Sequence, residues 1–326
     1  MILTAAEDDD GRRLDRILRK ALPSAPLSLV HRLLRQGKIL VDNKMAGAAT
    51  KVFRGNRITL PGIALDSQKA TRESACGVDT KSGYARPPSL PALEILYEGG
   101  GILAVSKAAG VVVHGGNSLE EAVRAYLAGK TAPSLSFRPG PLHRLDKGTS
   151  GVIVFSTSLE GARRFSALLA GGKLRKRYLA ILEGRLSAQR WEHRLLRTPS
   201  GNRVLAGAGG KTAAAAVTPL AAADGLSLVL LEPETGRTHQ LRLQAAACGH
   251  PLWGDKKYGA SGPRRTFFLH ALSLEFPRSD PPRPKGAFPG KIEAALPEDF
   301  ARALTRIFGV LDINSILQKR TRYDTL

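Results

Sequence analysis

The chain is poor in cysteine and has no long hydrophobic run. Its two cysteines, Cys76 and Cys248, are too few for a disulfide framework or for a metal cluster held by thiolates alone. No stretch of about 18 apolar residues occurs, so the sequence predicts neither a membrane-spanning helix nor a membrane partner. Residues 1–13 carry acids where a signal peptide needs a basic start and an apolar core. We therefore expect a protein of the cytoplasm, where thiols stay reduced, and we expect it to act as a monomer.

Acidic residues are scarce beside basic ones. The 326 residues hold 28 Asp and Glu against 49 Lys and Arg, which gives a formal net charge of +21 and a pI of about 10.5. The electric field of such a chain attracts a polyanion, and an ordinary charged surface explains so large an imbalance poorly. The composition therefore predicts RNA or another nucleic acid as the partner, and the length predicts one large domain with one small domain.

Several common catalytic signatures are missing as well. Residues 206–216 contain Gly-Lys-Thr, but a phosphate-binding P-loop needs a glycine at the position that Leu205 occupies. The seven histidines have no HExxH spacing, and no GxSxG sequence occurs. The sequence thus predicts a protein without a nucleotide or metal cofactor, and the glycine run is expected to form a loop or hairpin tip.

Residues 1–65 have the pattern of a small basic α+β domain. Apolar residues at helical spacing predict two short helices, and short apolar runs around the turn at residues 42–44 predict strands. Residues 12–57 contain twelve Lys or Arg against two acids. We expect Arg32, Arg35 and Lys38 to face outward and to bind RNA. The alternative is a solvated helical pair whose cations serve only solubility.

The rest of the chain divides by composition into three parts. Residues 66–92 are rich in Pro, Gly and Ser without any period, which predicts a flexible linker. From residue 93 to 311, apolar strands alternate with short amphipathic helices, which predicts a large α+β catalytic domain. Residues 312–326 form a polar tail.

The sequence HRLDKGTSG, residues 143–151, places one carboxylate among cations and small residues, directly before an apolar strand. A reactive side chain often occupies such a loop on a rigid frame, so Asp146 is the candidate catalytic residue. The strand leads to a helix that we expect to begin at the N-cap Thr157 and to end at Gly171.

Two further segments carry candidate binding residues. Four cations between Lys173 and Arg177 precede Tyr178, and basic groups beside an aromatic ring suit a phosphate chain with a stacked base. Lys176 is the cation of this group that we expect to bind RNA. A tyrosine of the core beneath a solvated charge run is the alternative interpretation.

The segment GRTHQLR, residues 236–242, is expected to begin a helix at the N-cap Thr238, with a stop at Gly249. Its residues His239 and Arg242 lie three apart and could point into one cleft. Arg237, at the helix start, is expected to hold an anion there.

Together these segments resemble the RluA-type pseudouridine synthases over nearly the whole chain. HRLDKGTSG matches the family sequence HRLDxxTSG, KRYLAILEG resembles its K-x-Y segment, and GRTHQLR with GHPLWGDKKYG resembles its third region. Ser106, Lys107 and Ala108 stand where the family has Asn-Lys-Pro, a departure that changes no catalytic group. VHGG, residues 113–116, is most similar to members that modify large-subunit ribosomal RNA, and the N-terminal domain resembles the S-four-like RNA-binding module.

The resemblance implies an isomerase that converts uridines of RNA to pseudouridine without a cofactor. It implies a mixed, largely antiparallel sheet flanked by helices, with a central cleft. Asp146 would be the catalytic group, as a nucleophile towards ring or sugar or as a base towards the sugar. Arg242 would pair with Asp146, and Tyr178 would stack on the target base. Arg144 would fill the gap in the RNA or hold the flipped nucleotide, while Thr149 would shape the loop.

Two functions from other classes stay open. The chain could be an RNA-binding or ribosome-assembly factor without activity, although Asp146, Tyr178 and Arg242 are all present. It could also be a nucleoside glycosidase, which normally requires a second carboxylate. Glu183 and Asp255 are the nearest candidates for that second group, and their surroundings indicate structural roles.

Overall fold

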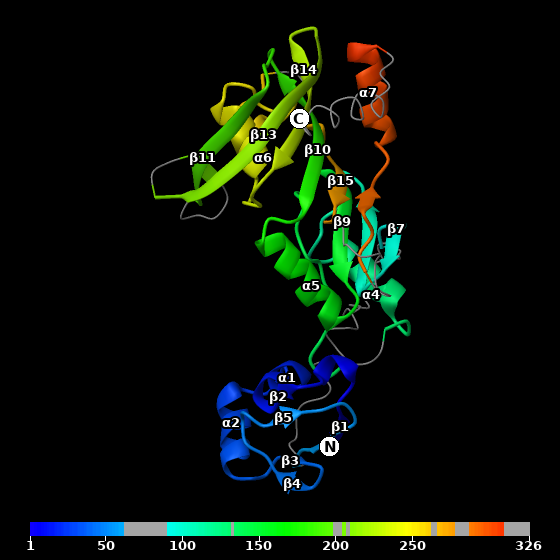
Figure 1. The fold of residues 1–326 in the computed structure, drawn as a ribbon, viewed down its shortest axis with the longest axis vertical. Coiled ribbons are helices and arrows are strands. Elements are labelled where there is room, and N and C mark those ends of the chain that lie inside the picture. The colour runs from blue at the N-terminus through cyan, green and yellow to red at the C-terminus, as the bar shows by residue number, and fades with distance from the viewer. Residues whose placement is uncertain are drawn as a thin grey trace, which may run out of the picture. The chain divides into compact units, whose positions relative to one another are not determined.

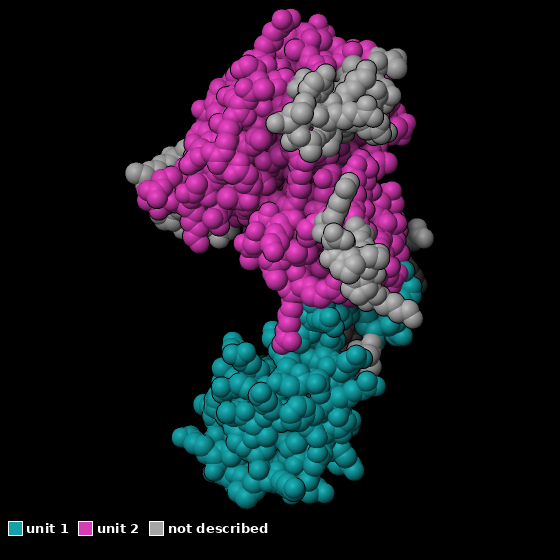
Figure 2. Space-filling view, in the orientation of Figure 1, with its two compact units in different colours: residues 1–89, 124–140, 156–162 teal, residues 90–123, 141–155, 163–326 magenta. Residues whose placement is uncertain are grey.

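The computed structural model describes residues 1–61, 90–131, 134–197, 204–206, 209–261, 266–277 and 287–309. The chain divides into two compact units, drawn in two colours in Figure 2: unit 1 has residues 1–89, 124–140 and 156–162, and unit 2 has residues 90–123, 141–155 and 163–326. Apart from residues 90–92, the predicted linker lies outside the described residues, as does the predicted tail. Among the helices that the structure describes, none is long and apolar enough to cross a membrane.

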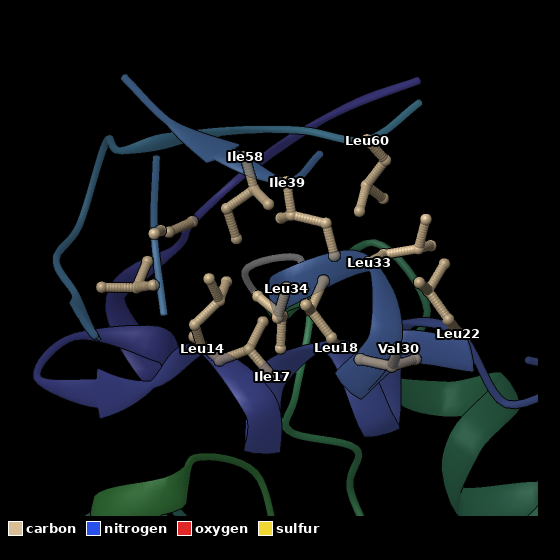
Figure 3. Packing of buried hydrophobic residues seen from close by; sticks show 13 residues of the cluster. Leu14, Ile17, Leu18, Leu22, Val30, Leu33, Leu34, Ile39, Ile58 and Leu60 are labelled. Carbon is tan, nitrogen blue, oxygen red and sulfur yellow. The ribbon is translucent and has the colours of Figure 1, made fainter. Parts of the chain in front are cut away.

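Unit 1 contains the two helices that the sequence predicts. They are α1 (Leu14–Ala21) and α2 (Leu27–Arg35), and each buries one apolar stripe. Figure 3 shows these stripes facing Ile58 and other strand residues, so that helices and strands share one core. Arg32 and Arg35 of α2 and the following Lys38 remain exposed to solvent.

The strands of unit 1 are short: β1 (Ile2–Thr4), β2 (Arg12–Arg13), β3 (Leu40–Val41), β4 (Lys44–Met45), β5 (Lys51–Val52) and β6 (Arg57–Thr59). One sheet has the order β1-β6-β3-β4, and β2 pairs with β5. The predicted turn is present, with Asp42 and Asn43 at positive φ. The sequence did not reveal β1, because three residues are too few to show a period.

A buried carboxylate joins distant segments inside unit 1. Asp9 has no exposed surface, and its oxygens accept hydrogen bonds from the hydroxyls of Ser134 (3.1 Å) and Ser136 and from the Leu135 amide (3.0 Å). The amide of Ala6 also donates to it, at 3.0 Å. Burial raises the pKa of Asp9, but the hydrogen bonds outweigh burial and hold this pKa below its ordinary value.

Ten strands of the described residues form one large mixed sheet, in the order β12-β11-β13-β14-β10-β15-β9-β8-β7, with β16 paired to β15 (Figure 1). Strand β9 pairs with β15 in parallel, while β10 and β14 pair antiparallel, as does β13 with β14. The strands of this sheet are β7 Glu94–Gly99, β8 Ile102–Lys107, β9 Ser150–Ser156, β10 Arg175–Glu183, β11 Gln189–Arg197, β12 Val204–Ala206, β13 Lys211–Ala223, β14 Leu226–Pro233, β15 Leu269–Glu275 and β16 Lys291–Glu293. The predicted α+β class, with a largely antiparallel sheet, is confirmed.

Helices cover both faces of this sheet in unit 2. Alternate residues of β10 point to opposite faces, so Leu179 packs towards α7 (Glu298–Phe308) and Leu182 packs towards α6 (Gln240–Ala247). Phe165 of α5 (Leu159–Ala170) packs on the end of the sheet formed by β8 and β9. The sheet is therefore a buried platform along most of its length. The remaining helices of the described residues are α4 (Leu119–Leu127), η1 (Glu7–Asp9) and η2 (Lys256–Tyr258).

The predicted N-cap of α5 was wrong by one residue. The hydroxyl of Ser158, not that of Thr157, accepts the Gly161 amide at 3.0 Å. The helix ends before Gly171, as predicted. Both residues are hydroxylic, so composition alone could not choose between them.

The parallel pairing of β9 with β15 depends on two residues at the start of β9. Gly151 has a φ of 108°, and a Cβ there would lie 2.2 Å from the carbonyl oxygen of Ala271, so only glycine fits. The hydroxyl of Ser150 lies 3.0 Å from Nδ1 of His270, whose Nε2 lies 3.2 Å from the Ala294 carbonyl oxygen. A carbonyl only accepts, so Nε2 carries the proton and Ser150 donates to Nδ1.

Candidate active site

A cavity of about 420 Å³ opens in unit 2 beside the start of β9. The loop before β9, strand β10 and the segment that leads into α6 all contribute to its wall. The predicted residues that line it are Arg144, Asp146, Thr149, Lys176, Tyr178, Arg237 and Arg242. Arg32, Arg35 and Lys38 belong to unit 1 and do not line this cavity.

Asp146 lies in a tight turn in the wall of the cavity. Its carbonyl oxygen accepts the Thr149 amide at 3.0 Å, and Thr149 itself is almost fully buried. The Asp146 side chain is 13% exposed, with Oδ2 at 3.2 Å from Nη1 of Arg242 and Oδ1 at 3.8 Å from Nε2 of His239. Each carboxylate oxygen therefore faces a different nitrogen.

Arg242 connects two carboxylates. Its Nε and Nη2 donate to Asp255 at 2.6 Å and 2.8 Å, while its Nη1 donates to Asp146. The guanidinium carbon also lies 4.4 Å from the ring centre of Phe267. Burial lowers the pKa of Arg242, but hydrogen bonds and charge from Asp255 and Asp146 raise it above the ordinary value. Arg242 is thus a permanent cation held in one orientation.

Tyr178 and Lys176 reach the cavity from β10. They are two residues apart, so they share one face of the strand, and an irregularity in the pairing with β15 lies just before Tyr178. Burial and the charge of Asp146 raise the pKa of Tyr178, which keeps its phenol protonated. The Lys176 ammonium donates to the Thr235 carbonyl at 3.0 Å, and burial lowers its pKa. Tyr178 lies within β10 and not at its start.

Two other cations near Tyr178, Arg175 and Arg177, have structural partners. Nε of Arg175 and Nε of Arg177 lie 2.6 Å and 3.0 Å from the same oxygen of Glu232, and Arg177 also pairs with Glu275 at 2.9 Å. Of the four cations between residues 173 and 177, Lys176 is the one among the residues that line the cavity.

Two exposed arginines stand at the cavity. Arg144 approaches the hydroxyl of Thr238 at 3.5 Å, and Nε of Arg237 donates to the Thr212 carbonyl at 3.1 Å. The prediction of Thr238 as the N-cap of α6 was wrong, because His239 precedes the first helical residue and adopts a left-handed conformation. Long, exposed arginines at a cavity suit a phosphate chain.

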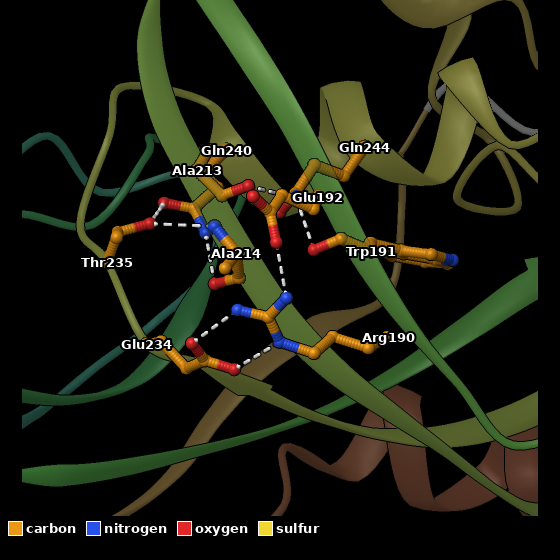
Figure 4. Close-up of polar contacts among 9 residues, drawn as sticks. All are labelled: Arg190, Trp191, Glu192, Ala213, Ala214, Glu234, Thr235, Gln240 and Gln244. Carbon is orange, nitrogen blue, oxygen red and sulfur yellow. Dashed lines mark hydrogen bonds and ion pairs between the residues drawn. The ribbon is translucent and has the colours of Figure 1, made fainter.

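Glutamine side chains fix the cavity wall to the sheet. Figure 4 shows Gln240 between Thr235, whose hydroxyl donates to Oε1 at 2.7 Å, and the Ala214 carbonyl, which accepts from Nε2 at 3.0 Å. One turn later, Gln244 donates to the carbonyl groups of Trp191 and Ala213 at 3.2 Å and 3.1 Å. Helix α6 is therefore tied to β11 and β13.

An ion pair on the sheet surface borders the same wall. Arg190 binds both carboxylate oxygens of Glu234 at 2.9 Å and also contacts Glu192 (Figure 4). All three side chains are about half exposed, so this contact adds little stability.

Two residues that hold the Asp146 loop, the buried Lys107 and the half-buried His143, were not predicted from the sequence to do so. Nε2 of His143 accepts the Val154 amide at 3.1 Å, and burial with the nearby Lys176 charge lowers the pKa of His143 to about 4. The Lys107 ammonium donates to three carbonyls, including that of Lys147 at 3.1 Å, and burial lowers its pKa to about 8. Both residues lie in segments that resemble the family, but sequence gives no sign of their contacts.

Comparison with known proteins identifies the class. A family model described as RNA pseudouridylate synthase matches residues 101–247. The ribosomal large subunit pseudouridine synthase C of Buchnera aphidicola is 30% identical over 289 residues, which are 84% of this chain and 88% of that protein. The protein of the same name from Escherichia coli is 29% identical and covers 94% of this chain and 96% of its own length.

A solved structure agrees with these relatives. The human RNA pseudouridylate synthase domain containing 1 matches with a TM-score of 0.55 and 25% identity, over 72% of this chain and 97% of that chain. A mixed sheet with helices on both faces is thus the fold of an RNA-modifying isomerase. The chain belongs to the RNA pseudouridylate synthase family, and it converts uridine to pseudouridine in RNA. Within the described residues, no group of three or more His, Cys, Asp or Glu could hold a metal ion.

Proposed function

We propose that this enzyme modifies uridines of large-subunit ribosomal RNA in the cytoplasm, as a monomer, and that Asp146 is its catalytic residue. The observation that carries the proposal is the ion pair between Asp146 and Arg242 inside the cavity. The names of the relatives support the choice of RNA, since both are large-subunit ribosomal synthases.

The reaction rearranges one nucleotide without adding or removing atoms overall. The bond between uracil N1 and the ribose C1′ breaks, the ring turns, and C5 forms a new bond to C1′. The proton that C5 carried is lost, and N1 gains one. Asp146 acts as a nucleophile on ring or sugar, or as a base towards the sugar. Arg242 stabilises its negative charge in each case.

The other cavity residues bind the nucleotide in this proposal. A base inside folded RNA must leave its stack, at a cost of a few kcal/mol, before it can enter a closed site. Tyr178 then stacks on the uracil, and Arg144 occupies the gap or holds the flipped nucleotide. Lys176 and Arg237 bind phosphates, and Thr149 shapes the turn around the carboxylate.

We also propose that residues 1–65 act as an RNA-binding module joined by a linker, residues 66–92, to a catalytic domain, residues 93–311. Residues 312–326 remain a tail. The support is chemical: Arg32, Arg35 and Lys38 are exposed together at α2 and just beyond it. Exposed cations on one surface attract the RNA backbone without reading its sequence.

The variant Asp146→Asn tests the catalytic role. It keeps the size of the side chain but removes the charge and the nucleophile, so we expect folding and RNA affinity close to those of the parent and no pseudouridine. The assay is tritium release from C5-labelled uridine in ribosomal RNA fragments.

The RNA substrate is identified by mapping pseudouridines in cells that lack the protein. We expect the parent protein to restore the missing sites in these cells and Asp146→Asn not to restore them. Turnover by Asp146→Asn would contradict the catalytic role, and loss of sites only in transfer RNA would contradict the choice of substrate.

A nucleoside glycosidase is less well supported. Among the described residues that line the cavity, Asp146 is the one carboxylate, whereas Asp255 is bound to Arg242 and Glu183 accepts hydrogen bonds from Ser261. Glycosidases normally use two carboxylates on opposite sides of the scissile bond. Free uracil released by the parent protein would favour the glycosidase.

A further inference from the structure

His239 stands out by its backbone conformation. Its φ is 52° and its ψ is 23°, in the left-handed region that residues other than glycine seldom adopt. It lies between Thr238 and the first residue of α6, where an extended N-cap residue is usual. Uncommon backbone conformations concentrate at functional sites, where the surrounding structure holds them.

The conformation directs the two ring nitrogens of His239 to two different groups. Nδ1 lies 2.7 Å from the hydroxyl oxygen of Tyr258, and the two rings meet edge to face with their centres 5.8 Å apart. Nε2 lies 3.8 Å from Oδ1 of Asp146. Because Arg242 binds Oδ2 at 3.2 Å, the two side chains together face both carboxylate oxygens.

The charges around His239 favour its neutral form. Burial lowers the pKa of His239, and the charges of Arg242, Lys257 and Arg144 lower it further, while Asp146 opposes them. The Tyr258 hydroxyl is the remaining polar neighbour on Nδ1. The net direction is downward, so the ring carries one proton at neutral pH, either on Nδ1 or on Nε2.

Electrostatics selects between these two tautomers. With the proton on Nδ1, the lone pair of Nε2 would face the negative Asp146 oxygen, which is repulsive. With the proton on Nε2, an N–H faces Asp146, and the Tyr258 hydroxyl donates to the lone pair of Nδ1. Only the second arrangement makes both contacts favourable: Asp146 selects the proton on Nε2, and the Tyr258 hydroxyl donates to the bare Nδ1.

We infer that Tyr258 and His239 form a positioning pair that orients Asp146 through an Nε2–H group directed at Oδ1. The inference rests on the proposed catalytic role of Asp146. Oδ2 is occupied by Arg242, whereas 3.8 Å leaves Oδ1 without a full hydrogen bond. Oδ1 is therefore the oxygen that meets the nucleotide, with the Nε2–H group beside it to hold the carboxylate in place. Neither side chain of the pair takes part in bond making.

The tautomer can be measured directly. Nitrogen NMR of protein labelled in histidine distinguishes a protonated from an unprotonated ring nitrogen, and the spectrum of His239→Gln identifies the signals of His239. We expect Nε2 protonated and Nδ1 bare in the parent, and a displaced Nδ1 signal in Tyr258→Phe, which removes the hydroxyl that donates to this nitrogen. A parent protonated on Nδ1, or an unchanged spectrum in Tyr258→Phe, would overturn the inference.

Substitutions of His239 separate the backbone from the ring. Asn adopts the left-handed conformation readily but is too short to reach Asp146, so His239→Asn should fold at least as stably as the parent. We expect its kcat to fall about 10-fold with KM unchanged, because orientation matters only once RNA is bound. Gln places an amide N–H near the position of Nε2, so His239→Gln should recover part of that loss.

A matched tyrosine serves as the control. Tyr97→Phe removes a hydroxyl that donates to the Ala287 carbonyl at 3.4 Å, away from the cavity, and should leave kcat unchanged. Tyr258→Phe should lower kcat about threefold to 10-fold. Full kcat in His239→Asn beside an inactive Asp146→Asn would defeat this inference alone. An active Asp146→Asn would instead defeat the proposed function, whatever the tautomer.

Discussion

At the scale of single residues, Arg242 has two roles because it contacts two carboxylates. Asp255 is 2% exposed and has two hydrogen bonds from Arg242, whereas Asp146 has one. Loss of the guanidinium would therefore leave one carboxylate buried without its cation, in addition to disturbing the reactive one. A buried unpaired charge is among the costliest defects that a substitution can produce.

We predict that Arg242→Met abolishes activity and also lowers the free energy of unfolding of unit 2 by about 3–5 kcal/mol. Asp146→Asn should abolish activity with little change in stability, because its side chain is partly exposed. Urea unfolding together with the tritium-release assay measures both quantities. The double variant Arg242→Met with Asp255→Asn removes the stranded charge, and it should regain stability without regaining activity. Equal stability of Arg242→Met and the parent would contradict the bridging role.

Single residues differ in how far their roles could be predicted from the sequence. Asp146 could be singled out from its local sequence HRLDKGTSG, one carboxylate among cations and small residues, and the structure places it in the cavity wall. The backbone contacts of His143 and Lys107 could not be found, since a buried polar side chain is defined by partners that are distant along the chain. The left-handed conformation of His239 was not predicted for the same reason, because the side chain contacts Tyr258 and Asp146, and Asp146 is distant along the chain.

At the scale of elements, the start of β9 decides the geometry of the site. Strand β9 follows the Asp146 turn directly and pairs in parallel with β15 at His270 and Ala271. The close approach at Gly151 has no room for a side chain. Any side chain at position 151 would push β9 away from β15, and the turn that carries Asp146 would move with it.

We predict that Gly151→Ala lowers the free energy of unfolding by more than about 3 kcal/mol and reduces kcat strongly. The matched control is Gly172→Ala, at a φ of 66° after α5, where an added Cβ would meet nothing within 4 Å. That variant should cost about 1–2 kcal/mol, the conformational part alone, and should keep its activity. Unfolding curves of both variants give the difference, and equal losses would show that the contact with Ala271 is not limiting.

The elements themselves were predictable to different degrees. Helices α1 and α2 were expected because their apolar residues recur at helical spacing over two turns or more. The order of the strands could not be derived from the residues. Apolar residues along β10 and β14 indicate that both faces of these strands are covered, but they do not indicate which strands are neighbours. What was predicted of the sheet, that it is mixed and largely antiparallel, came from resemblance to a family and not from periodicity.

At the scale of the whole molecule, Asp9 joins the start of the chain to residues 134–136 inside unit 1. The carboxylate has no exposed surface and depends on its charge to hold four donors. Because its folded pKa lies below the ordinary value of 3.8, its stabilisation is fully present above that pH. The stabilisation is lost as the pH falls through the lower folded pKa.

We predict that Asp9→Asn lowers the free energy of opening of unit 1 by about 1–3 kcal/mol at neutral pH. The difference between parent and variant should stay constant down to about pH 4 and shrink below it. Hydrogen exchange of amides in α1 and α2 measures the opening. Asp224→Asn, at an exposed turn in unit 2, should show no such difference, and a gap that widens towards acid would contradict the argument.

The charge of the molecule yields a prediction about RNA binding. Replacing Arg32, Arg35 and Lys38 by Gln should weaken RNA binding and reduce the slope of log affinity against log salt by up to about 0.7–0.9 per lost phosphate contact. The control replaces Arg302, Arg306 and Lys291 of unit 2 by Gln, which changes the net charge equally. Affinity measured at several salt concentrations compares them, and equal slopes would mean that net charge alone attracts the RNA.

The position of β15 in the sheet determines when the enzyme can fold during its synthesis. β15 lies between β9 and β10, although Ser150 and its partner His270 are 120 residues apart in the chain. A chain is synthesised from its N-terminus, so β9 and β10 leave the ribosome well before the strand that separates them. Until β15 arrives, both carry open edges, and pairing over such a separation is slow. The newborn chain therefore cannot fix the turn before β9 until β15 has also been synthesised, and we expect a chain that stops short of β15 to be unable to modify RNA.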